Sequence, residues 1–278
     1  MKLGLSMWSF AASVRRGEMD ISGFIRQAKT FGVDGVELLD FFWSDRAAEL
    51  PAVEAALAET GLPVGVYSVA NNFVLASSAE RAANVQKIAD GVDNAVHFGA
   101  KTVRVFAGDL SPGISYEQGL AWIIEGLKEA SAYAYQKNTT LALENHGLLA
   151  GRSDQIETIL NAVASPALKA NPDTGNFLLV HQASHLAVAK LATRAAMCHF
   201  KDFHVVPDNY AGTAYVGSEG LKFAGTVIGE GDVDLPDCVK SLKEAGFDGW
   251  LNIEYEGEED PVTAIARSVV YTRALLSD

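Results

Sequence analysis

The feature that most constrains the fold is an alternation of short apolar runs with longer amphipathic segments, repeated eight times along 278 residues. Such an alternation is typical of a parallel sheet covered by helices. The strand-like runs begin near Leu3, Val33, Leu62, Lys101, Thr139, Leu168, Ala195 and Gly249. Their spacing averages about 35 residues, close to one strand–helix unit of a β/α barrel.

The segments between these runs have the spacing of amphipathic helices. Apolar residues recur every three or four positions over residues 21–31, 85–96 and 235–242. Each of these segments is followed by a glycine of the kind that ends helices, namely Gly32, Gly99 and Gly246.

Eight strand–helix units predict an α/β fold, a single-domain (β/α)8 TIM barrel over residues 1–278. The alternative is an open doubly wound sheet. The first strand is not followed by GxGxxG, and no GxxxxGK[ST] motif occurs, so the closed barrel is favoured.

Composition excludes several classes of function. The chain carries 22 Lys and Arg against 35 Asp and Glu, a net charge of −13, which argues against binding a nucleic-acid backbone. Two cysteines, Cys198 and Cys238, offer neither a disulfide framework nor a CxxC zinc site. No signal peptide is recognisable, and no apolar run approaches the roughly 20 residues of a membrane helix. We therefore expect a cytoplasmic protein with no membrane partner.

Polar side chains gather where four consecutive strands end. In a barrel, side chains alternate inward and outward, and functional groups lie at the C-terminal ends of the strands. On this pattern the inward-facing groups at four strand ends are Glu144, Asp173, His199 and Glu254. Met197 and Lys201 share the face of His199, and Cys198 points away from it.

Three carboxylates in one pocket repel one another, and buried unpaired charges are costly. A divalent cation resolves this conflict. Oxygen ligands with one imidazole favour Mn²⁺, with Mg²⁺, Co²⁺ or Zn²⁺ as alternatives. The competing interpretation is that each acid pairs separately with a cation such as Lys201 or Arg104.

A metal flanked by two carboxylates suggests proton transfer on a small sugar or keto-sugar. The metal polarises a carbonyl, and Glu144 and Glu254 act as bases through an enediolate. Return of the proton elsewhere isomerises the sugar, and return to the opposite face epimerises it. Loss of a β-hydroxyl would instead make a dehydratase or lyase, and a non-catalytic sugar-binding barrel is the third hypothesis. Side chains expected to bind the substrate are His146, Lys201, Asn176 and Trp8.

Several other residues carry weaker expectations. Glu37 ends strand two and Asn72 follows strand three, and both could reach the mouth; Arg104 on strand four is expected to pair with a barrel carboxylate. His181 and His185 are four apart on an expected helix, where a metal role is disfavoured because no third ligand is near.

Two segments near the end of the chain are harder to interpret. The stretch Phe203–Gly231 is read as irregular, a lid or substrate loop over the mouth. The acidic run from Glu256 to Asp260 is read as the start of the last helix, although Glu256 could approach the site.

At these residues the sequence resembles the xylose isomerase-like TIM barrels, in their sugar phosphate isomerase/epimerase branch. The matching pieces, in the family order, are Leu143–His146, Asp173–Asn176, His199–Asp202, Gly229–Asp234 and Gly249–Glu254. The resemblance implies one divalent metal held by Glu144, Asp173, His199 and Glu254, with the two glutamates doubling as acid/base groups. It is also compatible with a homo-oligomer.

The chain departs from parts of that family. Abasic-site endonucleases of this fold carry a histidine three residues after the strand-six aspartate, where this chain has Asn176. Ketose 3-epimerases place an arginine after strand seven, a region that here reads His199–His204 without one. These departures argue against DNA repair and against a classical ketose 3-epimerase.

Overall fold

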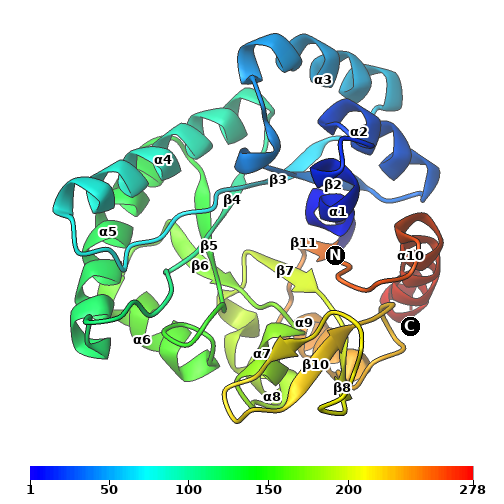
Figure 1. Ribbon diagram of the computed structural model, residues 1–278. Coiled ribbons are helices and arrows are strands. Elements are labelled where there is room, and N and C mark those ends of the chain that lie inside the picture. Colours follow the sequence, from blue (N-terminus) through cyan, green and yellow to red (C-terminus); the bar gives the residue numbers. More distant parts are fainter. Residues whose placement is uncertain (278) are drawn as a thin grey trace.

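The structure, a computed structural model, describes residues 1–277 and contains eight parallel strands in one sheet (Figure 1). These strands are β1 (Lys2–Ser6), β2 (Gly35–Leu39), β3 (Val64–Ser68), β4 (Thr102–Val105), β5 (Thr140–Glu144), β6 (Leu168–Asn171), β7 (Met197–Phe200) and β11 (Trp250–Ile253). Every strand begins within two residues of its predicted position. Their order is β6-β5-β4-β3-β2-β1-β11-β7, and the bridges Ala170–Ala195 and Asp173–His199 connect the two edges. The predicted TIM barrel is therefore confirmed.

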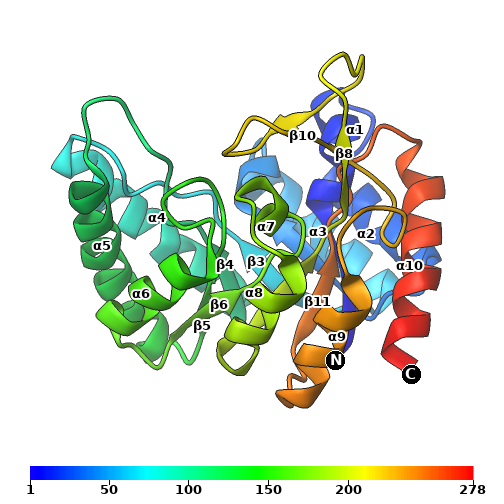
Figure 2. The ribbon, with the colours of Figure 1, turned by 90° about the horizontal axis from the view of Figure 1, so that it is seen from below.

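Helices surround this barrel on the outside (Figures 1 and 2). They are α1 (Ala11–Arg15), α2 (Ile21–Thr30), α3 (Arg46–Thr60), α4 (Ser78–His97), α5 (Tyr116–Gln136), α6 (Ser153–Val163), α7 (Asn176–Leu179), α8 (Ser184–Leu191), α9 (Leu235–Glu244) and α10 (Pro261–Ser277), with short 3₁₀ turns η1 (Met7–Phe10), η2 (Asp40–Phe42) and η3 (Ala192–Arg194). The predicted stop glycines Gly32, Gly99 and Gly246 have φ of 72°, 75° and 70°. This left-handed conformation explains why glycine occupies those positions. Over residues 1–277, none of the helices combines the length and the apolar character that crossing a bilayer requires.

The inside of the barrel is apolar at one end and polar at the other. Val66 and Ala142, in the middle of β3 and β5, pack together with Met197 and Trp250, at the start of β7 and β11. A Cβ atom on Gly65 would lie 2.4 Å from the Trp250 ring, so this close approach requires glycine. The outward strand face packs on the helices, and Cys198 is buried there as predicted. The apolar floor confines polar chemistry to the opposite, C-terminal end.

The segment after β7 is more regular than the sequence suggested. It contains a three-stranded antiparallel sheet of β8 (Phe203–Val206), β10 (Lys222–Gly225) and β9 (Tyr215–Val216), so the irregular-loop interpretation was wrong for these residues. This sheet stands at the same end of the barrel as α1 (Figure 2). Asp202 anchors the chain that follows, because its carboxylate accepts N–H bonds from Gly229 at 2.9 Å and Gly231 at 3.0 Å.

Candidate active site

The four residues predicted to hold a metal meet at the C-terminal end of the barrel. One ligand atom from each of Glu144, Asp173, His199 and Glu254 lies within 4.8 Å of the other three. All four side chains are buried. They converge because β5, β6, β7 and β11 carry them at or just beyond strand ends, and the Asp173–His199 bridge brings the barrel edges together.

The imidazole of His199 points one nitrogen into this cluster. Its Nδ1 lies 3.1 Å from Glu144 Oε2 and 3.6 Å from Glu254 Oε2. Among the described residues, neither His199 Nδ1 nor Asp173 Oδ2 has a partner in hydrogen-bond geometry, although charged groups lie 3.1 and 3.0 Å away. Buried polar atoms are normally satisfied, so these two indicate a missing partner. Three carboxylates and one imidazole fit a divalent cation.

Two cations also lie against the cluster, as the competing interpretation expected. Lys201 Nζ is 3.0 Å from Asp173 Oδ2 and 2.7 Å from Glu254 Oε2. Arg104 Nε is 3.3 Å from Glu144 Oε2, which confirms its predicted pairing with a barrel carboxylate. The carboxylates thus lie together in one cluster and are partly paired with these two cations. They are not each paired with a different cation in a separate place.

Counting charges shows that these cations do not balance the site. It holds five carboxylates, Glu37, Glu144, Asp173, Glu254 and Glu256, against three groups that can carry positive charge, Arg104, Lys201 and His199. With all five carboxyl groups ionised, an excess of two negative charges is left even with a doubly protonated imidazole. A divalent cation would compensate this excess.

The electrostatic conflict is visible in the pKa values of the carboxyl groups. Burial raises the pKa of Asp173, and the nearby charges of Glu144 and Glu254 raise it further, to about 7. Burial also acts on Glu144, but His199 and Arg104 outweigh it and lower its pKa to about 2. Opposite shifts in neighbouring carboxyl groups are typical of functional sites.

Glu144 is held in place by two amides. Asn171 Nδ2 donates to Glu144 Oε2 at 3.3 Å, and Asn176 Nδ2 donates to Glu144 Oε1 at 3.2 Å. Asn176 also donates to the Asn145 carbonyl at 3.1 Å. Asn176 was predicted to bind substrate, and in the structure its amide holds the carboxylate of Glu144.

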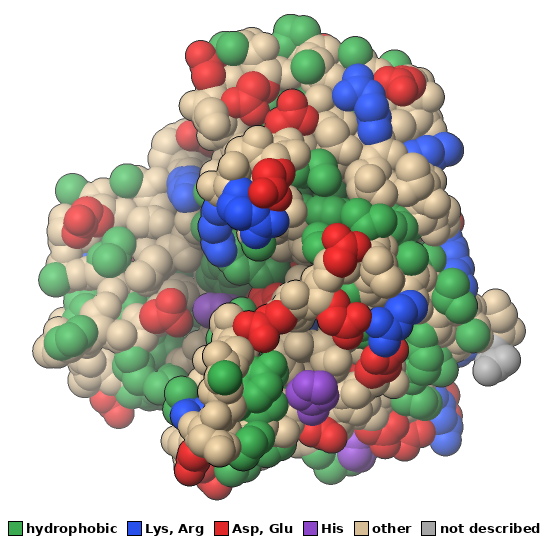
Figure 3. All heavy atoms as spheres, turned by 45° about the vertical axis from the view of Figure 1, so that its right-hand side comes forward, with side chains coloured by type: hydrophobic (Ala, Val, Ile, Leu, Met, Phe, Trp, Pro, Cys, Tyr) green, Lys and Arg blue, Asp and Glu red, His purple; other side chains and the backbone are tan. Residues whose placement is uncertain are grey.

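A pocket of about 360 Å³ opens above the cluster, within the size range of small-molecule sites. Its lining consists of Trp8, Arg15, Phe41, Ala70, Asn71, Arg104, Phe106, Gly108, Asp109, Glu144, His146, Lys201, Glu254 and Glu256. Figure 3 shows this face of the molecule hollowed, with hydrophobic, basic, acidic and histidine side chains around the hollow. Three of the four expected substrate-binding residues, His146, Lys201 and Trp8, belong to this lining.

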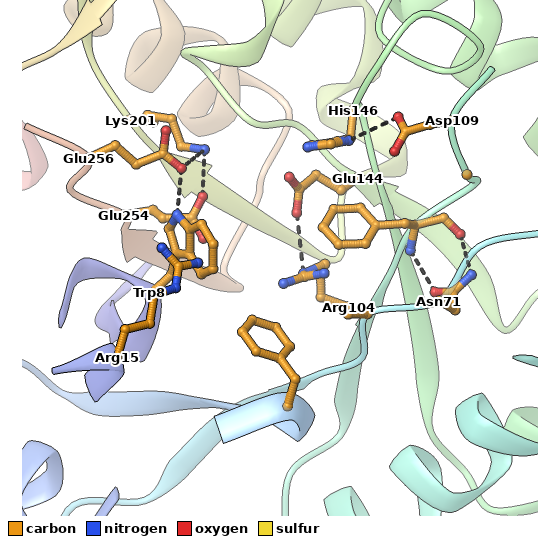
Figure 4. A pocket seen from close by; sticks show the side chains of 14 residues that line it. Trp8, Arg15, Asn71, Arg104, Asp109, Glu144, His146, Lys201, Glu254 and Glu256 are labelled. Carbon is orange, nitrogen blue, oxygen red and sulfur yellow. Dashed lines mark hydrogen bonds and ion pairs between the residues drawn. The ribbon is translucent and has the colours of Figure 1, made fainter. Parts of the chain in front are cut away.

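The close view shows two groups of polar side chains facing each other across the pocket (Figure 4). Glu254 and Lys201 lie on one side, and Glu144 and His146 on the other. His146 Nδ1 is 3.8 Å from Asp109 Oδ1. A substrate between the two groups would have a carboxylate on either side.

Glu256 belongs to the site, which was the less favoured interpretation from sequence. It lies five residues before α10, which begins at Pro261, so the interpretation of this acidic run as the start of the helix was wrong for Glu256. It holds for Asp260, whose carboxylate accepts from Thr263 N at 3.0 Å in the first turn. Glu256 Oε1 lies 3.1 Å from Lys201 Nζ and accepts from Trp8 Nε1 at 2.5 Å. The signal was present in the alternation that puts Glu256 on the face of Glu254.

Glu37 in β2 and the residues after β3 divide between the site and its surroundings. Glu37 is fully buried and contacts His199 from inside the barrel. Asn72 instead folds back on its own loop, where its Oδ1 accepts from Val74 N at 2.8 Å. Its neighbour Asn71 lines the pocket and was not singled out by sequence.

The two histidines at helical spacing do not form a site. His181 lies between α7 and α8, so the expectation of one helix carrying both was wrong. His181 is 3.6 Å from Glu219, and His185 is 3.8 Å from Asp234. Their acidic partners differ, which agrees with the disfavoured metal role.

Fold and site together define a TIM barrel with a buried Glu–Asp–His–Glu cluster at its mouth. Residues 25–275 match the family model described as xylose isomerase-like TIM barrel, and the chain belongs to this family. The predicted family is therefore confirmed.

The chain is 25% identical over 268 residues to the L-ribulose-5-phosphate 3-epimerase UlaE of Salmonella typhi, covering 91% of this chain and 89% of that protein. In structure it is similar to a xylose isomerase-like TIM barrel protein from Mycobacterium smegmatis in complex with magnesium, with a TM-score of 0.77, 17% identity and coverage of 99% and 96%. It is also similar to the probable 3-DHS dehydratase AsbF of Bacillus anthracis, with a TM-score of 0.76, 19% identity and coverage of 98% and 99%. These likenesses establish the fold.

Proposed function

We propose that this protein is a divalent-metal-dependent isomerase or epimerase of a small sugar or keto-sugar, acting in the cytoplasm. The observation that carries the proposal is the buried cluster of three carboxylates and one imidazole at the base of the mouth pocket. A curated relative along most of the chain is a sugar epimerase, which supports the same class of reaction.

Glu144, Asp173, His199 and Glu254 would hold the ion, with Mn²⁺ favoured by the oxygen-rich ligand set. The ion supplies Lewis acidity that polarises a sugar carbonyl and acidifies the adjacent C–H bond. His199 Nδ1 and Asp173 Oδ2, which are buried without a partner in hydrogen-bond geometry among the described residues, support this set of ligands.

Glu144 and Glu254 are proposed as the acid/base pair. They come from β5 and from the end of β11, and they approach the pocket from two sides (Figure 4). One carboxylate removes the proton next to the carbonyl, which leaves an enediolate. Return of a proton by the other carboxylate on the opposite face gives epimerisation, and return to the neighbouring carbon gives isomerisation.

The remaining pocket residues bind and orient the substrate in this proposal. Lys201 and His146 donate hydrogen bonds to sugar oxygens from the two sides of the pocket. Trp8 and Phe106 offer flat apolar surfaces on which the carbon skeleton can stack. Asn176 acts indirectly, by orienting Glu144.

The test is proton exchange in D2O. Protein loaded with Mn²⁺ is incubated with ketopentoses, with and without a 5-phosphate, and the products are analysed by NMR and mass spectrometry. Deuterium next to the carbonyl at otherwise unchanged mass supports the proposal. Loss of one water molecule from the product would instead indicate the dehydratase.

Site variants assign the two bases. Glu144→Gln and Glu254→Gln should each abolish exchange while the fold is retained. Glu258→Gln, which removes the same charge from a side chain that bonds Thr213 N outside the pocket, should retain it. An active Glu254→Gln protein would contradict the assigned role.

A further inference from the structure

Glu37 is a fully buried carboxylate that lies inside the barrel next to the proposed metal ligands. It stands on β2, whereas His199 stands on β7, and β1 and β11 separate these strands in the sheet. The contact between the two side chains therefore crosses the barrel interior. A buried charge in such a position is retained only where hydrogen bonds compensate it.

The contact fixes the orientation of the His199 ring. His199 Nε2 is 3.0 Å from Glu37 Oε1 and 3.0 Å from Glu37 Oε2. The opposite ring nitrogen, Nδ1, points into the Glu144–Asp173–Glu254 cluster without a hydrogen-bond partner among the described residues. An imidazole that ligates a metal is neutral and has one N–H. Donation of this N–H to Glu37 would place it on Nε2 and leave the Nδ1 lone pair for the cation.

Glu37 is itself held by two further donors. Asn252 Nδ2 donates to Glu37 Oε2 at 2.7 Å, and the Ser68 hydroxyl donates to Glu37 Oε1. Asn252 pairs with His199 in the register of β11 and β7, so the ring and the amide that holds its partner are fixed by the same strands. Glu37 is not among the residues that line the mouth pocket, whereas Glu144 and Glu254 are, so Glu37 is a poor candidate for a base.

We propose that Glu37 is a positioning residue, which holds His199 with Nε2–H toward itself and presents Nδ1 to a divalent cation. The inference rests on the proposed function, because a cation in the cluster is what Nδ1 would bind. Carboxylates that orient a ligating histidine commonly change metal affinity by about 10–100-fold when they are altered.

Two substitutions separate the effect of the Glu37–His199 contact from the effect of the Glu37 charge. Glu37→Asp keeps the charge but shortens the side chain by one methylene, so it loses the bond to His199. Glu37→Gln keeps the length and one acceptor oxygen but loses the charge. We expect the Mn²⁺ dissociation constant from calorimetry to rise at least tenfold in Glu37→Asp and only a few-fold in Glu37→Gln. The visible absorption of bound Co²⁺ should change in Glu37→Asp only.

Controls keep the test independent of folding and of turnover. Ser68→Ala removes a bond to Glu37 but none to His199, and it should change the Mn²⁺ dissociation constant by less than about threefold. Circular dichroism checks each fold, and if Glu37→Asp does not fold, Glu37→Met replaces it as a variant of native length without an acceptor.

The possible outcomes distinguish the positioning role of Glu37 from the proposed metal-dependent function on which it rests. Glu37→Asp (or Glu37→Met) protein that binds Mn²⁺ within twofold of the native affinity, with an unchanged Co²⁺ spectrum, would overturn the positioning role. Weaker binding by Glu37→Gln than by Glu37→Asp would overturn it too, because charge and not contact would then matter. Native protein that binds neither ion would overturn the proposed metal site itself.

Discussion

Replacing Lys201 by methionine tests whether its ammonium and a divalent cation stabilise the same carboxylates. Lys201 Nζ lies within 3.0 Å of both Asp173 and Glu254, and its side chain is only 4% exposed. Methionine has a similar length and volume but no charge. In metal-free protein, Lys201→Met therefore leaves two buried carboxylates without their nearest cation.

The size of the effect follows from this burial. Removing one partner of a buried ion pair costs about 3–5 kcal/mol. For a chain of this length, one kcal/mol corresponds to about 2 °C in Tm, so the expected loss in EDTA is about 6–10 °C. Lys190 provides a matched control, because its ion pair with Glu157 at 2.7 Å is solvent-exposed, and Lys190→Met should lose no more than about 1 kcal/mol.

The assay is thermal unfolding with EDTA or with saturating Mn²⁺. A cation that binds the native state at 100 times its Kd stabilises it by about 2.7 kcal/mol. The variant should gain more than the native protein from Mn²⁺, because no ammonium competes for Asp173 and Glu254. Equal gains in both proteins, or a variant as stable as the native protein in EDTA, would refute the idea of a shared set of oxygens.

Two further predictions concern the pocket rim and the barrel floor. Burial lowers the pKa of His146, but Asp109 and the charge of Glu144 together outweigh burial and raise that pKa above its usual value. Asp109→Asn should therefore lower the pKa of His146, which an NMR titration of the ring would show, and an unchanged midpoint would contradict the pairing. Gly65→Ala would press a Cβ atom against the Trp250 ring and should lower the free energy of unfolding, measured in urea, by about 1–3 kcal/mol. The smaller ring of Trp250→Phe should restore part of that stability in the double variant. Purely additive effects of the two substitutions would count against this contact.

The sequence predicts the barrel well because its local signals agree with one another. Apolar runs, amphipathic spacing and stop glycines such as Gly32 mark the same boundaries, and each signal depends only on nearby residues. The segment from Phe203 to Gly225 was misread because its strands are short, and β9 has only two residues. Their pairing depends on contacts within a small sheet that no local periodicity records.

The four proposed ligands could be predicted because each lies at a strand end, where alternation alone decides that a side chain points inward. The role of Glu37 was harder to predict, because its side chain contacts a residue on a strand three places away in the sheet. An inward side chain in the middle of a strand is normally part of an apolar core, and Val66 and Ala142 follow that rule. Glu37 breaks it, since the charge is compensated by His199, Asn252 and Ser68. The proposed positioning role therefore depends on contacts among side chains of four strands, β2, β3, β7 and β11, and no local pattern in the sequence records such contacts.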